Sequence, residues 1–229
     1  MRNRMQFFGK LSAILAGTSI VFLTSWTTTA ASDTWTPVVS KLRRTVTQIA
    51  SDGSETVTES WEGKYLRDFD GSELRTIKRI TPEEDEPAQT GIFTDRANQK
   101  AYALVFPTMT AVVKQRSLGG RQDPSVARER AHSQGREEKV FEGLPCFVMP
   151  VETHETEGST YSGSGCYSTE YDLHLYQVLD LTFEETGLTI RTVTELYDLE
   201  LGIAPKVDSV KLPDGFVIQD GFCPTCSPE

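Results

Sequence analysis

The sequence predicts a mainly β protein: a large curved antiparallel sheet or partial barrel of about ten strands with little helix. Two observations favour this class. Short runs rich in Thr, Val, Ile and aromatic residues recur along the chain with turn residues between them. No segment alternates strand and helix in the way that a doubly wound fold requires. The expected strands are residues 42–50, 56–66, 73–80, 90–95, 100–106, 110–116, 139–151, 165–169, 173–183, 188–199, 207–212 and 216–218.

The first three strands are expected to form a meander. The tetrapeptide Asp-Gly-Ser-Glu stands at residues 52–55 and again at 70–73, and Asp-Gly between alternating runs is a strong hairpin signal. In residues 56–66, apolar and polar side chains alternate, which indicates a half-buried strand. One side is expected to carry Val57, Trp61 and Tyr65 together with the exceptions Glu59 and Gly63, and the other side Thr58, Ser60, Glu62 and Lys64.

The middle of the chain contains two polar segments. Residues 82–87 form an acidic loop bounded by prolines, without the ligand spacing of a calcium site. Residues 117–138 are rich in Gly, Arg and Gln, which predicts a long surface insertion. Within it, Asp123 followed by Pro124 can cap a short helix that runs through Ala131.

The second half is expected to contain the longest hairpin, with its turn at residues 184–187, after a polar loop at 152–164. A last pair of strand signals, at 207–212 and 216–218, is separated by the turn Pro213-Asp214-Gly215.

The N-terminal segment predicts export. Arg2, Arg4 and Lys10 precede an uncharged run at 11–25, and small residues before Ser32 suit a signal peptidase. A retained membrane anchor is the alternative, but residues 24–29 are polar and fit a spanning helix poorly. We therefore expect a signal peptide at 1–31, a single β-rich domain at 32–219, a cysteine-containing tail at 220–229, and a periplasmic or secreted protein.

The charge is acidic throughout. The chain carries 23 basic and 33 acidic residues, a net charge of −10. Removal of the leader takes away three basic residues and no acidic residue, which makes the net charge −13. This charge disfavours nucleic acid and anionic lipid headgroups as partners and is typical of a soluble protein.

Four cysteines lie after the leader, at Cys146, Cys166, Cys223 and Cys226. An even number in an exported chain predicts two disulfides. Of the three pairings, we favour Cys146–Cys166 and Cys223–Cys226. Two alternatives stay open: thiol–disulfide chemistry at the Cys-Pro-Thr-Cys motif, and a zinc site made by all four thiolates.

No catalytic constellation appears. His132, His154 and His174 are isolated and are expected at the surface, and no nucleophile elbow, phosphate loop or dinucleotide fingerprint is present. The sequence predicts no catalytic residue, no metal and no cofactor, and a protein that is not an enzyme.

Several short motifs carry a family resemblance. They are Gly-Lys-Tyr-Leu-Arg-Asp at 63–68 before Asp70-Gly71, Ile-Phe-Thr-Asp at 92–95, Ala-Tyr-Ala-Leu at 101–104, Phe-Glu-Gly at 141–143, Cys-Tyr-Ser at 166–168 and Leu-Pro-Asp-Gly-Phe at 212–216. Their order resembles uncharacterised bacterial exported proteins with a curved half-barrel sheet. More remotely, it is similar to the periplasmic lipoprotein-carrier (outer-membrane lipoprotein-sorting) and sigma-regulator folds. The resemblance implies an apolar concave face that can hold acyl chains.

Three functions follow as hypotheses. The first is binding of a lipid, lipoprotein or apolar ligand in a sheet concavity, which an apolar hollow between helix and sheet would support and a filled core would oppose. The second is a structural or partner-binding envelope protein with no small ligand, and the third is the thiol chemistry above. Strand aromatics are expected to divide between core and concavity: Trp61, Tyr65, Tyr102, Phe106, Phe141, Phe147, Tyr176, Phe183 and Phe216.

Overall fold

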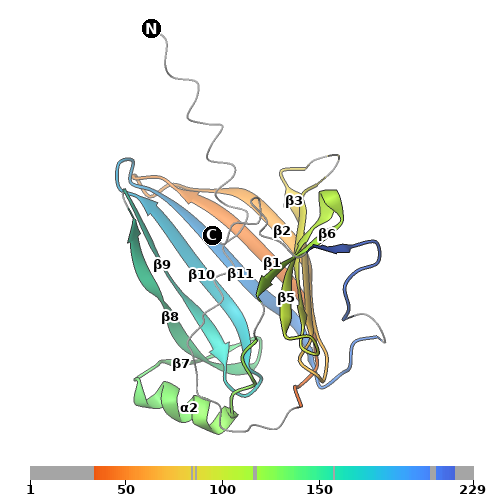
Figure 1. Ribbon diagram of the computed structural model, residues 1–229. Helices are drawn as coiled ribbons and strands as arrows, with labels where there is room; N and C mark the ends of the chain where they lie inside the picture. The colour runs from red at the N-terminus through yellow and green to blue at the C-terminus, as the bar shows by residue number, and fades with distance from the viewer. Residues whose placement is uncertain are drawn as a thin grey trace.

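One open, mostly antiparallel sheet makes up most of the computed structural model, which describes residues 34–83, 85, 87–115, 118–156, 158–206 and 210–219 (Figure 1). Within these ranges the sheet has twelve strands in the order β12-β6-β5-β4-β3-β2-β1-β11-β10-β9-β8-β7. Their bounds are β1 Val38–Ile49, β2 Glu55–Arg67, β3 Glu73–Thr81, β4 Gln89–Asp95, β5 Lys100–Val105, β6 Thr110–Gln115, β7 Glu138–Phe141, β8 Leu144–Thr156, β9 Ser159–Ser168, β10 Leu173–Phe183, β11 Leu188–Leu201 and β12 Val217–Gln219. The predicted fold class is confirmed.

Two meanders build the sheet, and β1 joins them. Strands β1 to β6 follow one another, as do β7 to β11, and β1 pairs with both β2 and β11. Figure 1 shows β3–β6 on one side of the molecule and β7–β10 on the other. The two edges of the sheet are β12 and β7, so the sheet is not closed.

The sheet bends strongly towards one face, and we call this concave face the trough. His174 on β10 and Arg75 on β3 line the same hollow. Three strands, β2, β1 and β11, lie between β3 and β10, and a flat sheet would separate them by about 19 Å at about 4.8 Å per strand. The proximity therefore requires curvature. The register places on the trough side Leu42 and Arg44 of β1, Trp61 and Tyr65 of β2, Glu73, Arg75 and Ile77 of β3, Gln177 of β10, and Thr194 and Leu196 of β11.

The opposite face is apolar over β3–β6 and is covered by the end of the described chain. Its buried cluster comprises Leu74, Phe93, Tyr102, Leu104 and Ala111, against which Phe106, Val113, Leu212 and Phe216 pack. The expected final pair of strands is wrong in part. Residues 210–212 are not a strand, and β12 pairs in parallel with β6 instead, because Leu212 and Phe216 are drawn onto this apolar surface; residues 207–209 lie outside the described ranges.

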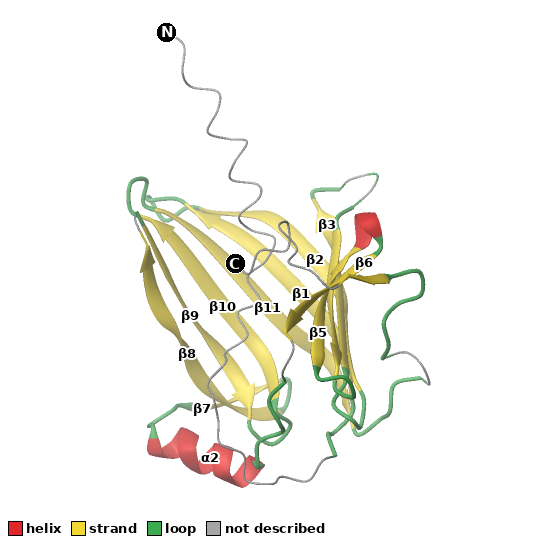
Figure 2. Cartoon of the chain, in the orientation of Figure 1, coloured by secondary structure: helices red, strands yellow, loops and turns green. Residues whose placement is uncertain are grey.

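The predicted short helix is confirmed within the insertion, as α2, Pro124–Ser133. The Asp123 carboxylate caps it by accepting hydrogen bonds from the backbone N–H groups of Ser125 and Val126. Figure 2 shows α2 beside the end of the sheet at which β7 lies. Two alanines of α2 are buried, and the ring of His132 lies 4.9 Å from that of Phe147 on β8. The described part of the insertion therefore packs against the sheet rather than forming surface loop throughout.

Two further expectations need correction. Within the polar loop expected at 152–164, residues 152–156 are instead the end of β8 and residues 159–164 belong to β9, because Ser, Thr and Tyr complete the pairing between these strands. Val57 does not share a face with Trp61. A bulge in β2 shifts the register against β1 between Val46 and Thr47 and turns Val57 outwards, leaving it 53% exposed.

A disulfide joins Cys146 of β8 to Cys166 of β9, with 5.4 Å between the two Cα atoms. Both cysteines are buried. This confirms the first predicted pair and excludes the four-cysteine zinc site, because a bonded sulfur is not a thiolate ligand. Cys223 and Cys226 lie outside the described residues, so the second pair stays a prediction.

Loss of this disulfide is expected to lower the free energy of unfolding by about 3 kcal/mol. The bond closes a loop of 20 residues, and the unfolded chain regains that conformational freedom when the bond is absent. Urea unfolding of the Cys146→Ser/Cys166→Ser double variant measures the change. An unchanged free energy of unfolding would show that β8–β9 pairing alone holds this region.

Candidate binding trough

The floor of the trough combines buried leucines with accessible polar groups. Five strands contribute, β3, β2, β1, β11 and β10, which are neighbours in the sheet. A hollow of about 50 Å³ is lined by Leu42, Tyr65, Arg75, His174, Leu175, Tyr176, Gln177, Thr194, Glu195 and Leu196. The floor is therefore amphipathic, whereas the resemblance implied an apolar one.

Arg67 fills one end of the trough. Its side chain is 0% exposed, and its guanidinium donates to the backbone oxygens of Thr36 (3.0 Å), Asp172 (3.0 Å) and Tyr171 (2.7 Å). The Trp35 ring lies 5.3 Å from the guanidinium carbon. This residue ties the start of the described chain and the β9–β10 turn to β2.

Glu73 is the carboxylate that balances this positive charge. It accepts hydrogen bonds from the Tyr65 hydroxyl (2.7 Å) and the Arg75 guanidinium (3.0 Å), and Arg67 lies 4.0 Å away. Burial favours a higher pKa, but the two arginines and the Tyr65 hydroxyl outweigh it and hold the pKa of Glu73 below its usual value. Burial and the Glu73 charge together raise the pKa of the Tyr65 hydroxyl, so this tyrosine stays protonated and donates.

A second buried carboxyl group behaves differently. Asp172 accepts a hydrogen bond from the Tyr167 hydroxyl. Burial raises the pKa of Asp172, and the Tyr167 bond and the Arg67 charge only partly oppose this. The hydroxyl and the carboxyl group satisfy each other, so this pair stabilises the β9–β10 turn rather than facing a ligand.

His174 stands at the trough surface and is neutral at pH 7. Partial desolvation by the surrounding strands and the nearby Arg75 charge lower the pKa of its ring from 6.5 to about 4, with Glu73 opposing the change. The side chain is exposed, as expected from the sequence. The sequence pattern did not indicate that it faces the trough.

The free energy of unfolding is expected to fall by about 1 kcal/mol between pH 6.5 and pH 4 because of His174. The unfolded chain takes up the proton near pH 6.5, whereas the folded chain takes it up only near pH 4. This contribution is therefore fully present above pH 6.5 and is lost as the pH falls towards 4. Solvent access to the ring keeps it below the value of the full pKa shift.

Chemical unfolding at a series of pH values checks this expectation. His174→Asn should flatten the curve between pH 6.5 and pH 4. His154→Asn, which changes an exposed histidine of β8, should not. An equal pH dependence in wild type and His174→Asn would contradict the assignment.

Arg44, further along the floor, has a guanidinium with unmet hydrogen-bonding capacity. The residue is half-buried, and its Nε is buried without a hydrogen-bond partner in the described structure. The Glu59 charge acts on Arg44, but that carboxylate accepts from the Trp61 indole N–H at 2.9 Å and lies 3.6 Å from Arg79. Burial lowers the pKa of Arg44, and Glu59 offsets this only in part. Arg44 therefore brings to the trough side a positive charge that Glu59 balances only in part.

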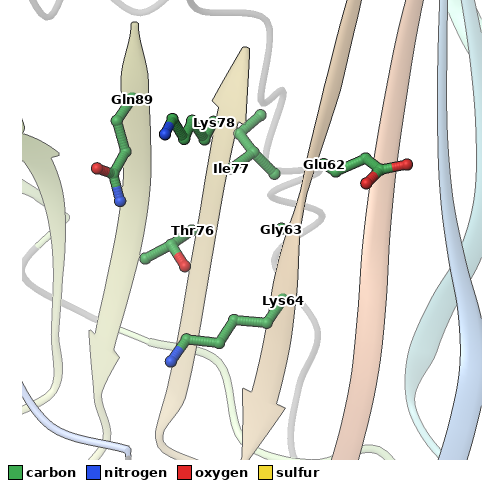
Figure 3. A pocket seen from close by; sticks show the side chains of 7 residues that line it. All are labelled: Glu62, Gly63, Lys64, Thr76, Ile77, Lys78 and Gln89. Atoms are coloured by element: carbon green, nitrogen blue, oxygen red, sulfur yellow. The ribbon is translucent and has the colours of Figure 1, made fainter. Parts of the chain in front are cut away.

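A second hollow, of about 340 Å³, lies on the outer face over β2 and β3 (Figure 3). It is lined by Glu62, Gly63, Lys64, Thr76, Ile77, Lys78 and Gln89. Neither this hollow nor the one at the trough floor is lined by a residue of α2. Neither of them is therefore the apolar hollow between helix and sheet that the sequence led us to expect.

Comparison with known proteins gives remote structural similarities. No family model and no curated protein matches the sequence. Among solved structures, the chain is similar to MucB in complex with MucA(peri), at 15% identity and a TM-score of 0.34, over 75% of this chain and 54% of that chain. It is also similar to a LolA superfamily protein from Nitrosomonas europaea, at 8% identity and a TM-score of 0.29, over 73% of this chain and 87% of that chain. A third similar structure is a DUF1329 family protein from Desulfovibrio piger. It is 11% identical with a TM-score of 0.28, over 76% of this chain and 87% of that chain.

The remote matches include proteins named for the LolA superfamily and for outer-membrane lipoprotein sorting, at TM-scores of 0.29 and 0.24. The chain spans about half the length of the MucB chain. These similarities concern the path of the backbone, and the chemistry of the trough comes from the residues of this chain.

The structure sorts the aromatic residues that the sequence left undivided. Trp61 and Tyr65 face the trough, whereas Tyr102, Phe106 and Phe216 belong to the outer cluster. The centres of the Phe141 and Tyr176 rings lie 5.4 Å apart. Among the described residues, no group of His, Cys, Asp and Glu is placed to hold a metal, and no helix is long and apolar enough to cross a membrane.

Sequence reasoning missed Arg44, Arg67 and Arg75. Polar residues at the inward positions of otherwise apolar strands were the available signal, since Glu59 already appeared on the apolar side of 56–66. Recognising an arginine there as a site residue requires the register, which sequence spacing does not supply.

Proposed function

We propose that the trough binds an amphipathic ligand, a lipid or the acyl-bearing part of a lipoprotein, without catalysing a reaction on it. The observation that carries this proposal is Arg44, a half-buried guanidinium with an unpartnered Nε beside an apolar floor. A buried donor without a partner is costly, and the anionic group of a ligand would satisfy it while the hydrocarbon part covers the leucines.

The distribution of charge supports the same conclusion. The net charge of the chain is −10, yet the trough side of β1–β3 carries four arginines, Arg44, Arg67, Arg75 and Arg79, against the two glutamates Glu59 and Glu73. An acidic protein with a locally basic concave face favours an anionic guest there over the rest of its surface.

A specific observation favours a second candidate, a partner-binding envelope protein without a small ligand. The hollow at the floor measures about 50 Å³, whereas ligand pockets usually measure about 300–1,000 Å³. A lipid must therefore lie along the open trough or move its walls apart, while a protein segment could dock against the trough without entering a cavity.

Export belongs to the same proposal. We propose that residues 1–31 are a leader, that residues 32–219 form one domain, and that residues 220–229 are a tail. The protein then acts in the periplasm or outside the cell, where lipids, lipoproteins and other envelope proteins are its partners. The Cys146–Cys166 disulfide supports an oxidising compartment.

Titration with a fluorescent fatty acid tests the binding function. Wild type should bind it, and Arg44→Gln should weaken binding about tenfold or more, because a hydrogen bond to a charged group contributes about 1.5–3 kcal/mol. Arg43→Gln is the matched control, since Arg43 is the neighbouring residue, faces outwards and pairs with Glu195. Absence of binding by wild type would favour the partner-binding candidate, and an equal loss in both variants would remove Arg44 from the site.

A further inference from the structure

We propose that the outer hollow between β2 and β3 binds a phosphate group, with Lys64 and Lys78 as its cationic ligands. This site is separate from the trough. Lys64 follows Gly63 and precedes Tyr65, so it points to the outer face while Tyr65 points into the trough.

Gly63 of β2 lies opposite Ile77 of β3, and both residues line the hollow. A Cβ atom on Gly63 would lie 1.8 Å from the backbone oxygen of Thr76, so β2 and β3 approach each other there more closely than any side chain would allow. Around this point the side chains of Lys64, Thr76, Lys78 and Gln89 stand on the outer face. Figure 3 shows both ammonium groups on the same side of their strands, in the direction of β4.

The two lysines have no counter-charge among the residues that the structure describes. Neither ammonium group forms an ion pair with any residue that the structure describes, in a chain with 33 acidic residues and 23 basic residues. Glu62 pairs with Lys78 in the sheet register and could neutralise it.

The Glu62 carboxylate turns the other way. Figure 3 shows it pointing from β2 towards β1. On that side its charge raises the pKa of both Lys41 and Arg43, although the largest effects on those two groups are the Asp198 hydrogen bond and burial, respectively. The hollow is thus left with two positive charges and with no carboxylate directed into it from its own lining.

A phosphate group matches what this hollow offers. Lysine presents a compact charge with three N–H donors, the Thr76 hydroxyl and the Gln89 amide add further donors, and phosphate supplies several charged acceptor oxygens. The volume of about 340 Å³ has room for a phosphate with a small substituent. The same chemistry is found in free phosphate compounds and in phospholipid headgroups.

Two binding measurements on the full chain test the site. Calorimetric titration with inorganic phosphate probes free phosphate, and co-sedimentation with phosphatidylcholine vesicles, with and without phosphatidylglycerol, probes the headgroup. Lys64→Gln/Lys78→Gln should weaken binding at least tenfold. The control Lys139→Gln/Lys211→Gln removes the same charge from lysines already paired with Glu137 and Asp214 and should bind as wild type does.

Each outcome decides the proposal. Binding of inorganic phosphate alone supports a site for free phosphate compounds, and additional binding to phosphatidylglycerol vesicles supports a headgroup site. No binding of either probe, or an equal loss in the control variant, overturns it. Fatty-acid binding in the trough should be unchanged in the Lys64→Gln/Lys78→Gln variant, so this site and the trough can fail independently.

Discussion

Replacement of Arg67 by methionine is expected to lower the free energy of unfolding by about 3–5 kcal/mol. Removal of one partner from a buried charge network leaves the other groups unpaired in a medium of low dielectric constant. Here the loss would strand three backbone oxygens, those of Thr36, Tyr171 and Asp172, and would remove one of the charges that hold Glu73 ionised.

Two comparisons separate this network from ordinary surface pairing. Arg67→Lys keeps the charge but cannot reproduce the planar fork of donors, so an intermediate loss is expected. Arg43→Met breaks the outward pair with Glu195, at 3.1 Å, and should cost about 1 kcal/mol or less. Urea unfolding measures all three variants. If Arg67→Met lowers the free energy of unfolding no more than Arg43→Met does, the buried network contributes no more to stability than an exposed ion pair.

Replacement of Gly63 by alanine is the second large effect, a loss of about 3 kcal/mol in the free energy of unfolding. The added methyl group would lie 1.8 Å from the Thr76 oxygen and 2.7 Å from the Cα atom of Ile77, both of which are backbone atoms that no rotamer change can move. Strands β2 and β3 would have to separate at the centre of the sheet, and overpacking of this kind typically costs about 1–3 kcal/mol.

Gly119→Ala is the matched control. Gly119 has no atom within 4 Å of the position of a Cβ atom, so the change in the free energy of unfolding should stay within about 0.5 kcal/mol. Thermal or urea unfolding of both variants gives the comparison. Equal stability of Gly63→Ala and wild type would mean that the β2–β3 approach can relax without cost.

The strands were predictable where turn chemistry and alternation agree, as at the two Asp-Gly turns and in the hairpin of β10 and β11. Prediction failed where long-range pairing decides the conformation. Residues 152–164 look like a polar loop locally, yet the adjacent strands pair through them. The face of Val57 depends on a bulge that forms against β1, and no pattern within β2 contains that information.

The site was less accessible from sequence than the fold. The Cys146–Cys166 pair could be inferred from compartment and spacing, because both are properties of the chain itself. The trough brings Arg75 of β3 near His174 of β10 through the curvature of strands that lie between them. The close approach of β2 and β3 that Gly63 permits is equally invisible until the neighbouring strand is in place.

The central position of β1 has a consequence for the order of folding. Ser40 of β1 donates through its hydroxyl to the backbone oxygen of Tyr197 on β11, a partner 157 residues further along the chain. Each meander consists of local hairpins that can form early, but the β1–β11 contact closes a loop of nearly the whole domain, and such contacts slow folding. A chain that has not yet emerged as far as β11 therefore holds β1 with one open edge, and the trough is completed only when the last long strand arrives.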